Sequence, residues 1–202
     1  MHDFVVYLPA GYDDDNSIVY PLLYLSHGGS GAAGDWQTQG YMSHIMDRLI
    51  RDKYIEPTIV VMPTFNGLLN VSNPPANVVG PLYQEHLFPY VEANYRVTND
   101  SAQKAFAGLS LGSVLTYEMY MNAIEDFGYY GFFSSALSPG HELSDYVKTN
   151  DTAQNPALLN RGILVVYGQF DIAFDDTKLL QQAFDSIGVK NVNRFVPWGS
   201  HF

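Results

Sequence analysis

The chain has 202 residues, no cysteine, and a formal net charge of −11 from 10 Lys+Arg against 21 Asp+Glu. This length suits one domain with a large core, so we expect a single domain over residues 1–202. An acidic chain without a basic stripe is not expected to bind nucleic acid or anionic lipid. The lack of cysteine excludes disulfides, thiolate metal sites and a cysteine nucleophile, and no apolar run approaches the ~20 residues of a membrane span.

Strand-like and helix-like segments alternate along the chain, which predicts an α/β fold with a mostly parallel central sheet and helices on both faces. Strands are expected at 4–8, 20–26, 58–62, 104–107, 163–167 and 192–196, and helices at 40–53, 81–94, 111–122 and 176–187. Pro89 should kink the second helix or mark its late start. Asp175 or Asp176 should cap the last helix, which Gly188 ends. The irregular stretch Asn66–Pro81 is expected to be a surface loop.

The sequence Gly108-Leu109-Ser110-Leu111-Gly112 joins a predicted strand to a predicted helix. A Gly-x-Ser-x-Gly turn in that setting is typical of the nucleophile elbow of α/β-hydrolases. The two glycines allow a sharp turn without a Cβ clash, so that the serine hydroxyl stands above the sheet edge. Ser110 is therefore the predicted nucleophile.

A serine nucleophile needs a base and an acid that orients the base, in the chain order Ser, Asp/Glu, His. Of the six histidines only His141 and His201 follow Ser110, and only His201 also follows an acid at the end of a strand. Asp171 lies just past the buried strand 163–167 and is the favoured acid. Asp175 and Asp176 are its competitors, although they suit the start of the next helix better.

Two backbone N–H groups are also needed to hold the oxyanion of an acyl-transfer intermediate. Leu111, directly after the serine, should supply one. The loop Ser26–Gly31, which we call the oxyanion loop, begins His-Gly-Gly after a strand and should supply the other. Gly29 is the favoured donor, with Gly28 and Ser30 as alternatives, and His27 is expected to brace the loop.

Cofactor and metal sites find little support in the sequence. Gly29-x-Gly31-x-x-Gly34 matches a dinucleotide fingerprint, but the acidic residue that should end a second strand about 20 residues later is missing. The histidines are scattered, and the acidic run at 13–15 lacks the spacing of a calcium loop. We expect no cofactor and no metal.

With these motifs the chain resembles the esterase-D-like branch of α/β-hydrolases, and most of all the feruloyl and acetylxylan esterases of carbohydrate esterase family one. The resemblance covers nearly the whole chain. Its matching stretches are 6–12, 20–29, Asp35-Trp36, 59–63, 87–97, 107–112 and 198–202. It implies that Ser110, Asp171 and His201 are nucleophile, acid and base. Such proteins usually have sequence ahead of the first strand and a helix after the histidine, so the domain is expected to be trimmed at both ends.

The resemblance implies a serine esterase that removes feruloyl or acetyl esters from plant cell-wall xylan through an acyl-enzyme. It also implies a secreted or periplasmic location, although the chain carries no signal peptide. Alternatives are a small-molecule esterase of the same fold, of the S-formylglutathione or siderophore type, and an inactive binding domain. The substrate is the expected partner, and the sequence does not fix the oligomeric state.

Two tryptophans and one loop are the candidates for substrate contacts. Trp36 and Trp198 flank the oxyanion loop and the predicted base. The Asn66–Pro81 loop follows a strand at the same sheet edge, where ligands bind in open α/β sheets. Together they are expected to wall a shallow, open cleft suited to an ester on a polymer.

Overall fold

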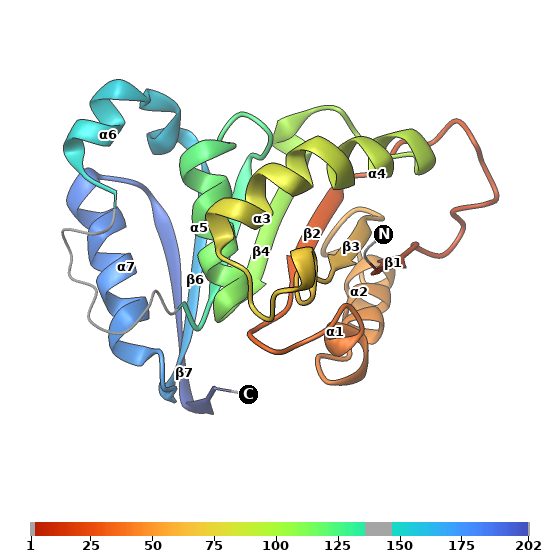
Figure 1. Cartoon of the computed structure of the whole chain (residues 1–202). Coiled ribbons are helices and arrows are strands. Elements are labelled where there is room, and N and C mark those ends of the chain that lie inside the picture. Colours follow the sequence, from red (N-terminus) through yellow and green to blue (C-terminus); the bar gives the residue numbers. More distant parts are fainter. Residues whose placement is uncertain (1–2, 136–146, 202) are drawn as a thin grey trace.

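The computed structural model describes residues 3–135 and 147–201. Its strands form one seven-stranded sheet in the order β1-β3-β2-β4-β5-β6-β7 (Figure 1). All neighbouring strands are parallel except β1, which pairs antiparallel with β3 at one edge. The strands are β1 Phe4–Tyr7, β2 Leu22–Ser26, β3 Ile59–Pro63, β4 Lys104–Leu109, β5 Tyr129–Phe133, β6 Gly162–Phe170 and β7 Asn191–Ser200.

Helices pack on both faces of this sheet, as predicted. The α-helices are α1 Asp35–Thr38, α2 Met42–Arg51, α3 Ala76–Leu82, α4 Phe88–Asn94, α5 Leu111–Asn122, α6 Thr149–Gln154 and α7 Phe174–Ile187. Short 3-10 turns lie at Leu68–Asn70, Ser101–Gln103 and Pro156–Asn160. In Figure 1, α3, α4, α5 and α7 cover one face, and α2 lies behind the sheet.

The two hydrophobic cores follow the alternation of side chains along the strands. In β3, Ile59 and Val61 belong to the larger core, whereas Val60 and Met62 face the smaller core under α2. The larger core is rich in packed aromatic rings, among them Tyr24, Phe106, Phe127, Tyr130 and Phe184. Most aromatic residues therefore stabilise the fold, and the aromatic content by itself says little about ligands.

The smaller core leaves part of its face open. An apolar trough of about 670 Å³ lies beside α2, lined by Met42 and Met46 and by residues of β2, β4, β5 and β6. No helix in the described part of the chain is both long and apolar enough to cross a bilayer.

Several elements differ from the sequence predictions, among them the short helices α1 and α6, which were not predicted. Strand β5 was not predicted. It contains Gly131, where a Cβ would lie 2.8 Å from the Cβ of Ala107 on β4, so the close spacing of the two strands requires glycine. The predicted loop Asn66–Pro81 is helical from Ala76, with Pro81 inside α3. Between α3 and α4, Tyr83–Leu87 forms a π-helical turn.

The π-helical turn lies directly before Pro89, which is in the first turn of α4. Proline has no N–H to donate there, and the wider turn accommodates its ring. The last helix, α7, begins at Phe174, so Asp175 and Asp176 occupy its first turn and do not cap it. Their charges still favour the helix N-terminus through its dipole. Gly188 ends α7 with φ of 81°, as predicted.

Candidate active site

Ser110 lies between β4 and α5 in a backbone conformation that few L-residues adopt. Its φ of 54° and ψ of −117° place the residue in strained territory. A Cβ on Gly108 would lie 2.2 Å from the Gly112 carbonyl oxygen, and a Cβ on Gly112 would lie 2.3 Å from that of His27. Both glycines of the elbow are therefore required, because the end of β4, the start of α5 and the oxyanion loop touch through their main chains.

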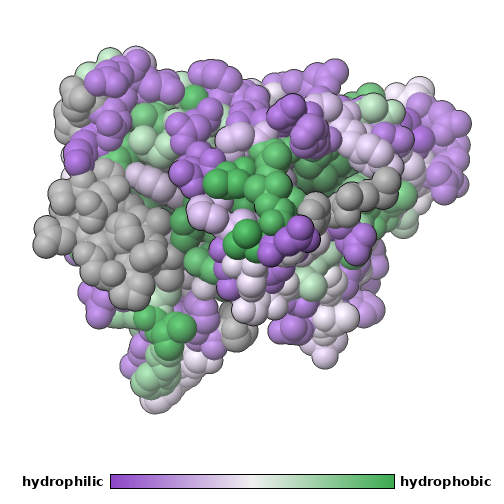
Figure 2. All heavy atoms as spheres, viewed as in Figure 1, coloured by the Kyte–Doolittle hydropathy of each residue, from purple (hydrophilic) through white to green (hydrophobic). Residues whose placement is uncertain are grey.

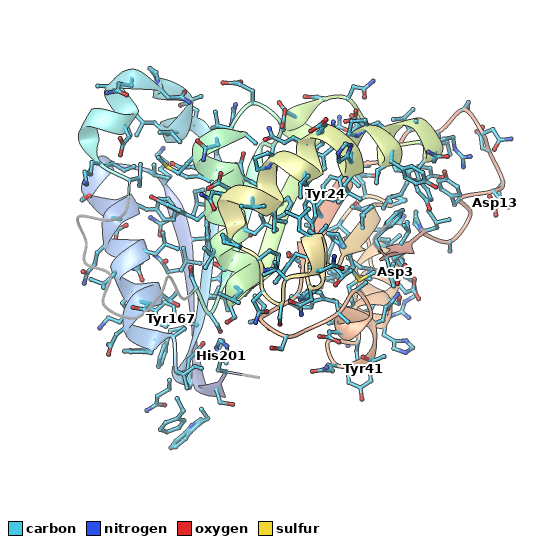
Figure 3. The ribbon with its side chains drawn as sticks, in the orientation of Figure 1. Asp3, Asp13, Tyr24, Tyr41, Tyr167 and His201 are labelled. Carbon is cyan, nitrogen blue, oxygen red and sulfur yellow. The ribbon has the colours of Figure 1, made fainter. Side chains whose placement is uncertain are left out.

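His201 and Asp171 meet at the same edge of the sheet. His201 Nδ1 lies 2.8 Å from Asp171 Oδ1, although the two residues are 30 positions apart. Asp171 directly follows β6 and His201 directly follows β7, whose end carries the labelled His201 in Figure 3. The alternative base, His141, lies outside the described residues.

The Asp171 carboxyl is buried, and the groups around it determine its pKa. Burial raises the pKa, but the nearby Ser134 side chain and the hydrogen bonds with the Ala173 amide and the His201 ring outweigh it and hold the pKa below its ordinary value. Asp171 is thus ionised at neutral pH and suited to stabilising a protonated histidine ring. Sequence reasoning missed Ser134 because it follows β5, the strand that was not predicted.

Ser110, Asp171 and His201 follow β4, β6 and β7, so the parallel sheet brings them to one edge. Among the described residues, the Ser110 hydroxyl makes no hydrogen bond to His201. Serine-to-base hydrogen bonds are often long without substrate and tighten only in the complex. The hydrogen bond at Nδ1 leaves Nε2 of His201 available as the proton acceptor.

His27 braces the oxyanion loop, as predicted, and the hydrogen bonds fix its tautomer. The Phe65 N–H donates to Nε2 at 3.3 Å, so Nε2 must be the unprotonated nitrogen. Nδ1 then carries the proton and donates to the Gly28 carbonyl at 2.6 Å. The ring stacks on Phe65 and is 1% exposed, and burial lowers its pKa. A neutral histidine thus holds the loop against β3.

Two asparagines hold the same loop from the other side, a role that sequence reasoning missed. The Ser30 N–H donates to Asn73 Oδ1 at 2.8 Å, and Asn66 Nδ2 donates to the Gly31 carbonyl at 2.6 Å. The Asn73 N–H in turn donates to Asn66 Oδ1 at 3.1 Å. The first half of the predicted substrate loop is therefore fastened to the oxyanion loop. Residues 66–73 therefore stabilise the oxyanion loop, in addition to any contact that they make with substrate.

The two predicted oxyanion donors lie next to each other. A Cβ on Gly29 would be 2.9 Å from Cδ1 of Leu111, so the two residues are in contact. Leu111 is the first residue of α5, where backbone N–H groups have no partner within the helix and the dipole favours negative charge. Anionic oxygen is the natural ligand of such a helix start.

The structure gives the two tryptophans different environments. Trp36 is half-buried, donates its indole N–H to the Ser26 carbonyl at 3.1 Å, and packs edge-on against Phe133. It therefore supports the strand that leads into the oxyanion loop. Trp198 is 80% exposed on β7, close in sequence to His201.

The chain belongs to the esterase family described as "Putative esterase", whose model matches residues 2–200. It is 32% identical over 174 residues to the "Endo-1,4-beta-xylanase/feruloyl esterase" of Xylanibacter ruminicola. That match covers 78% of this chain and 24% of the relative, so the chain spans about a quarter of that larger protein.

Solved structures share the fold at lower identity. The feruloyl esterase module of Clostridium thermocellum, complexed with sinapinate, matches with a TM-score of 0.86 and 23% identity, over 100% of this chain and 77% of that one. The S-formylglutathione hydrolase of Staphylococcus aureus matches with a TM-score of 0.74 and 16% identity, over 100% and 84%. These similarities show the α/β-hydrolase fold.

Proposed function

We propose that this protein is a serine esterase that removes feruloyl or acetyl groups from plant cell-wall xylan. The observation that carries the proposal is the hydrogen bond between His201 and the ionised Asp171, at the same sheet edge as the strained Ser110 elbow. Acyl transfer through a covalent acyl-enzyme is the reaction for which this combination of nucleophile, base, acid and helix-start amides is the established template.

In the proposed reaction, His201 Nε2 takes the proton of the Ser110 hydroxyl as its oxygen attacks the ester carbonyl. Asp171 stabilises the imidazolium that forms, and the Leu111 and Gly29 amides hold the oxyanion. Collapse of the tetrahedral intermediate breaks the ester bond, and the imidazolium gives its proton to the leaving alcohol. Water, deprotonated by His201, then attacks the acyl-serine and releases the carboxylic acid and free Ser110.

The choice of xylan esters is supported by the relatives. The Xylanibacter ruminicola protein is named as both a xylanase and a feruloyl esterase, and the Clostridium thermocellum module was crystallised with sinapinate, a phenolic acid. A thioesterase acting on a small molecule is the second candidate, favoured by the match to S-formylglutathione hydrolase. Action on a cell-wall polymer would place the enzyme outside the cytoplasm, and we propose a secreted or periplasmic location.

One substrate panel tests the proposal. We expect hydrolysis of methyl ferulate, feruloylated arabinoxylan or acetylated xylan, and we expect Ser110→Ala to abolish both turnover and labelling by a fluorophosphonate probe. A serine outside the site, such as Ser17→Ala, is the matched control and should label normally. Preference for S-formylglutathione over all xylan esters would favour the second candidate. Absence of labelling in the wild type would identify an inactive binding domain.

A further inference from the structure

The strands β6 and β7 extend beyond the rest of the sheet. The pairing of β5 with β6 ends at Phe133 and Val166, so among the described residues Tyr167–Phe170 pair with β7 alone. The extension carries an exposed aromatic pair, Phe170 and Trp198, whose ring centroids are 5.8 Å apart. In Figure 2, hydrophobic residues gather at the lower tip of the molecule, where Figure 1 places the ends of these strands.

Exposing this aromatic pair to water is energetically costly. Trp198 is 80% exposed and Phe170 is 58% exposed, so each ring leaves most of its apolar surface in water. Trp198 also has φ of 62°, in the left-handed region that favours glycine. Strain and exposed apolar surface that coincide beside an active site indicate a binding function.

Local backbone geometry holds the pair in place. The register between β6 and β7 shifts between Gly168 and Phe170. At this shift a Cβ on Gly168 would lie 2.4 Å from the backbone of Gly199, so the two glycines allow β6 and β7 to approach each other closely. The Trp198 N–H points to the Gln169 side-chain oxygen at 3.4 Å. The rings are thus carried by a defined bulge and not by a free loop.

The pair has a fixed relation to the catalytic residues. Phe170 directly precedes Asp171, and Trp198 lies three residues before His201. The same two strand ends therefore position both the aromatic pair and the hydrogen bond between Asp171 and His201.

The chemistry of the surroundings defines the kind of ligand. The segments 162–174 and 195–201 contain one carboxyl side chain, the buried Asp171, and one histidine, His201. A surface of exposed rings with neutral Gln169 and Ser200 suits an uncharged ligand with flat apolar faces and hydroxyl groups. These two segments contain no lysine or arginine for phosphate or for an anionic lipid headgroup, and the nearest cation along β7 is Arg194, directly before Phe195.

We propose that Phe170 and Trp198 form a platform on which pyranose rings of the xylan backbone stack, so that the ester side group reaches Ser110. This inference rests on the proposed function and adds the binding mode of the polymer. The platform is a specificity device for polymeric substrate, separate from the groups that carry out acyl transfer.

The test compares a polymeric with a small substrate of the same acyl group. Trp198→Gly removes the ring and suits the φ of 62°, so it should fold at least as well as the wild type. Phe170→Ala is the second variant, and Tyr54→Ala, which alters a 76% exposed ring in the turn after α2, is the control. We expect the ratio of kcat/KM for feruloylated arabinoxylan to that for methyl ferulate to fall about tenfold in the platform variants and to stay at the wild-type value in Tyr54→Ala.

A binding measurement separates failure of the platform from failure of the proposed function. Ester-free xylohexaose should bind wild type and Tyr54→Ala alike in a calorimetric titration, and about tenfold more weakly to Trp198→Gly, whether or not the protein hydrolyses any ester. Equal xylohexaose binding by all variants, or no binding by the wild type, overturns the platform. So does co-sedimentation of the wild type with phosphatidylcholine vesicles that Trp198→Gly loses, because the rings would then be a membrane contact.

Discussion

Replacing Gly112 by alanine should damage both stability and catalysis, because its Cβ would meet only main-chain atoms. The new carbon would lie 2.3 Å from the His27 carbonyl oxygen and 2.8 Å from that of Ser26. Non-bonded heavy atoms need about 3.5 Å, so α5 and the oxyanion loop must part by about 1 Å. No side-chain rotation can relieve this contact.

Two opposing free-energy terms set the size of the effect. Alanine is a better helix former than glycine by about 1 kcal/mol, and this favours the variant within α5. Overpacking typically costs about 1–3 kcal/mol, and the clash of the alanine Cβ with rigid main-chain atoms should cost at least the upper value of that range. The net expectation is a loss of about 2 kcal/mol in the free energy of unfolding. A 1 Å displacement of Ser110 and Leu111 from the oxyanion loop should also lower kcat about 100-fold.

The assays are urea denaturation and hydrolysis of p-nitrophenyl acetate. Gly34→Ala is the matched control, because a Cβ at that position meets nothing within 4 Å and its φ of −82° suits alanine. It should change the free energy of unfolding by less than about 0.5 kcal/mol, as surface substitutions usually do. If Gly112→Ala unfolds at the wild-type urea concentration and keeps more than about a third of kcat, the close-approach reasoning is wrong.

Three further predictions follow from the site. Asp171→Asn should lower kcat by about 10³–10⁴-fold, whereas Asp175→Asn, in the first turn of α7, should change kcat less than twofold; comparable losses would contradict the assignment of the acid. Asn73→Ala should lower kcat about tenfold by releasing the Ser30 amide, and Asn73→Asp, which keeps the acceptor oxygen, should restore most of it; equal activity of both would show the contact to be dispensable. The wild-type free energy of unfolding should fall as pH drops below about 6.5, because the unfolded state takes up a proton at His27 that the folded state resists. Urea titrations at pH 5 to 7 should show a flatter dependence of this free energy on pH for His27→Gln.

The sequence predicted the parts of the site that obey local rules. The elbow needs glycine on both sides of Ser110, and this requirement is visible in a five-residue pattern. The meeting of serine, acid and base follows from the parallel sheet, because the ends of β4, β6 and β7 share one edge. The hydrogen bond between Asp171 and His201 is where that logic places it.

The features that the sequence did not reveal depend on contacts between distant segments. Strand β5 was hidden because its short run contains Gly131, which weakens a strand signal but is needed for close packing against Ala107. Missing β5 meant missing Ser134. The role of Asn73 was hidden because its partner, Ser30, is 43 positions away. No local pattern distinguishes such an asparagine from an ordinary loop residue.

Four of the nine non-glycine residues with positive φ in the described chain lie where the proposed chemistry occurs. In the described chain, Ser30, Ser110, Ser134 and Trp198 all have positive φ, and each lies near the carboxyl ends of the parallel strands. Local rules would place glycine or asparagine there. Ser110 keeps its hydroxyl for attack, Ser134 supports Asp171, and Trp198 retains a ring that glycine would remove. Strained residues persist only where the surrounding structure holds them. The rigid sheet therefore allows residues at this edge to keep their side chains in backbone conformations that favour glycine.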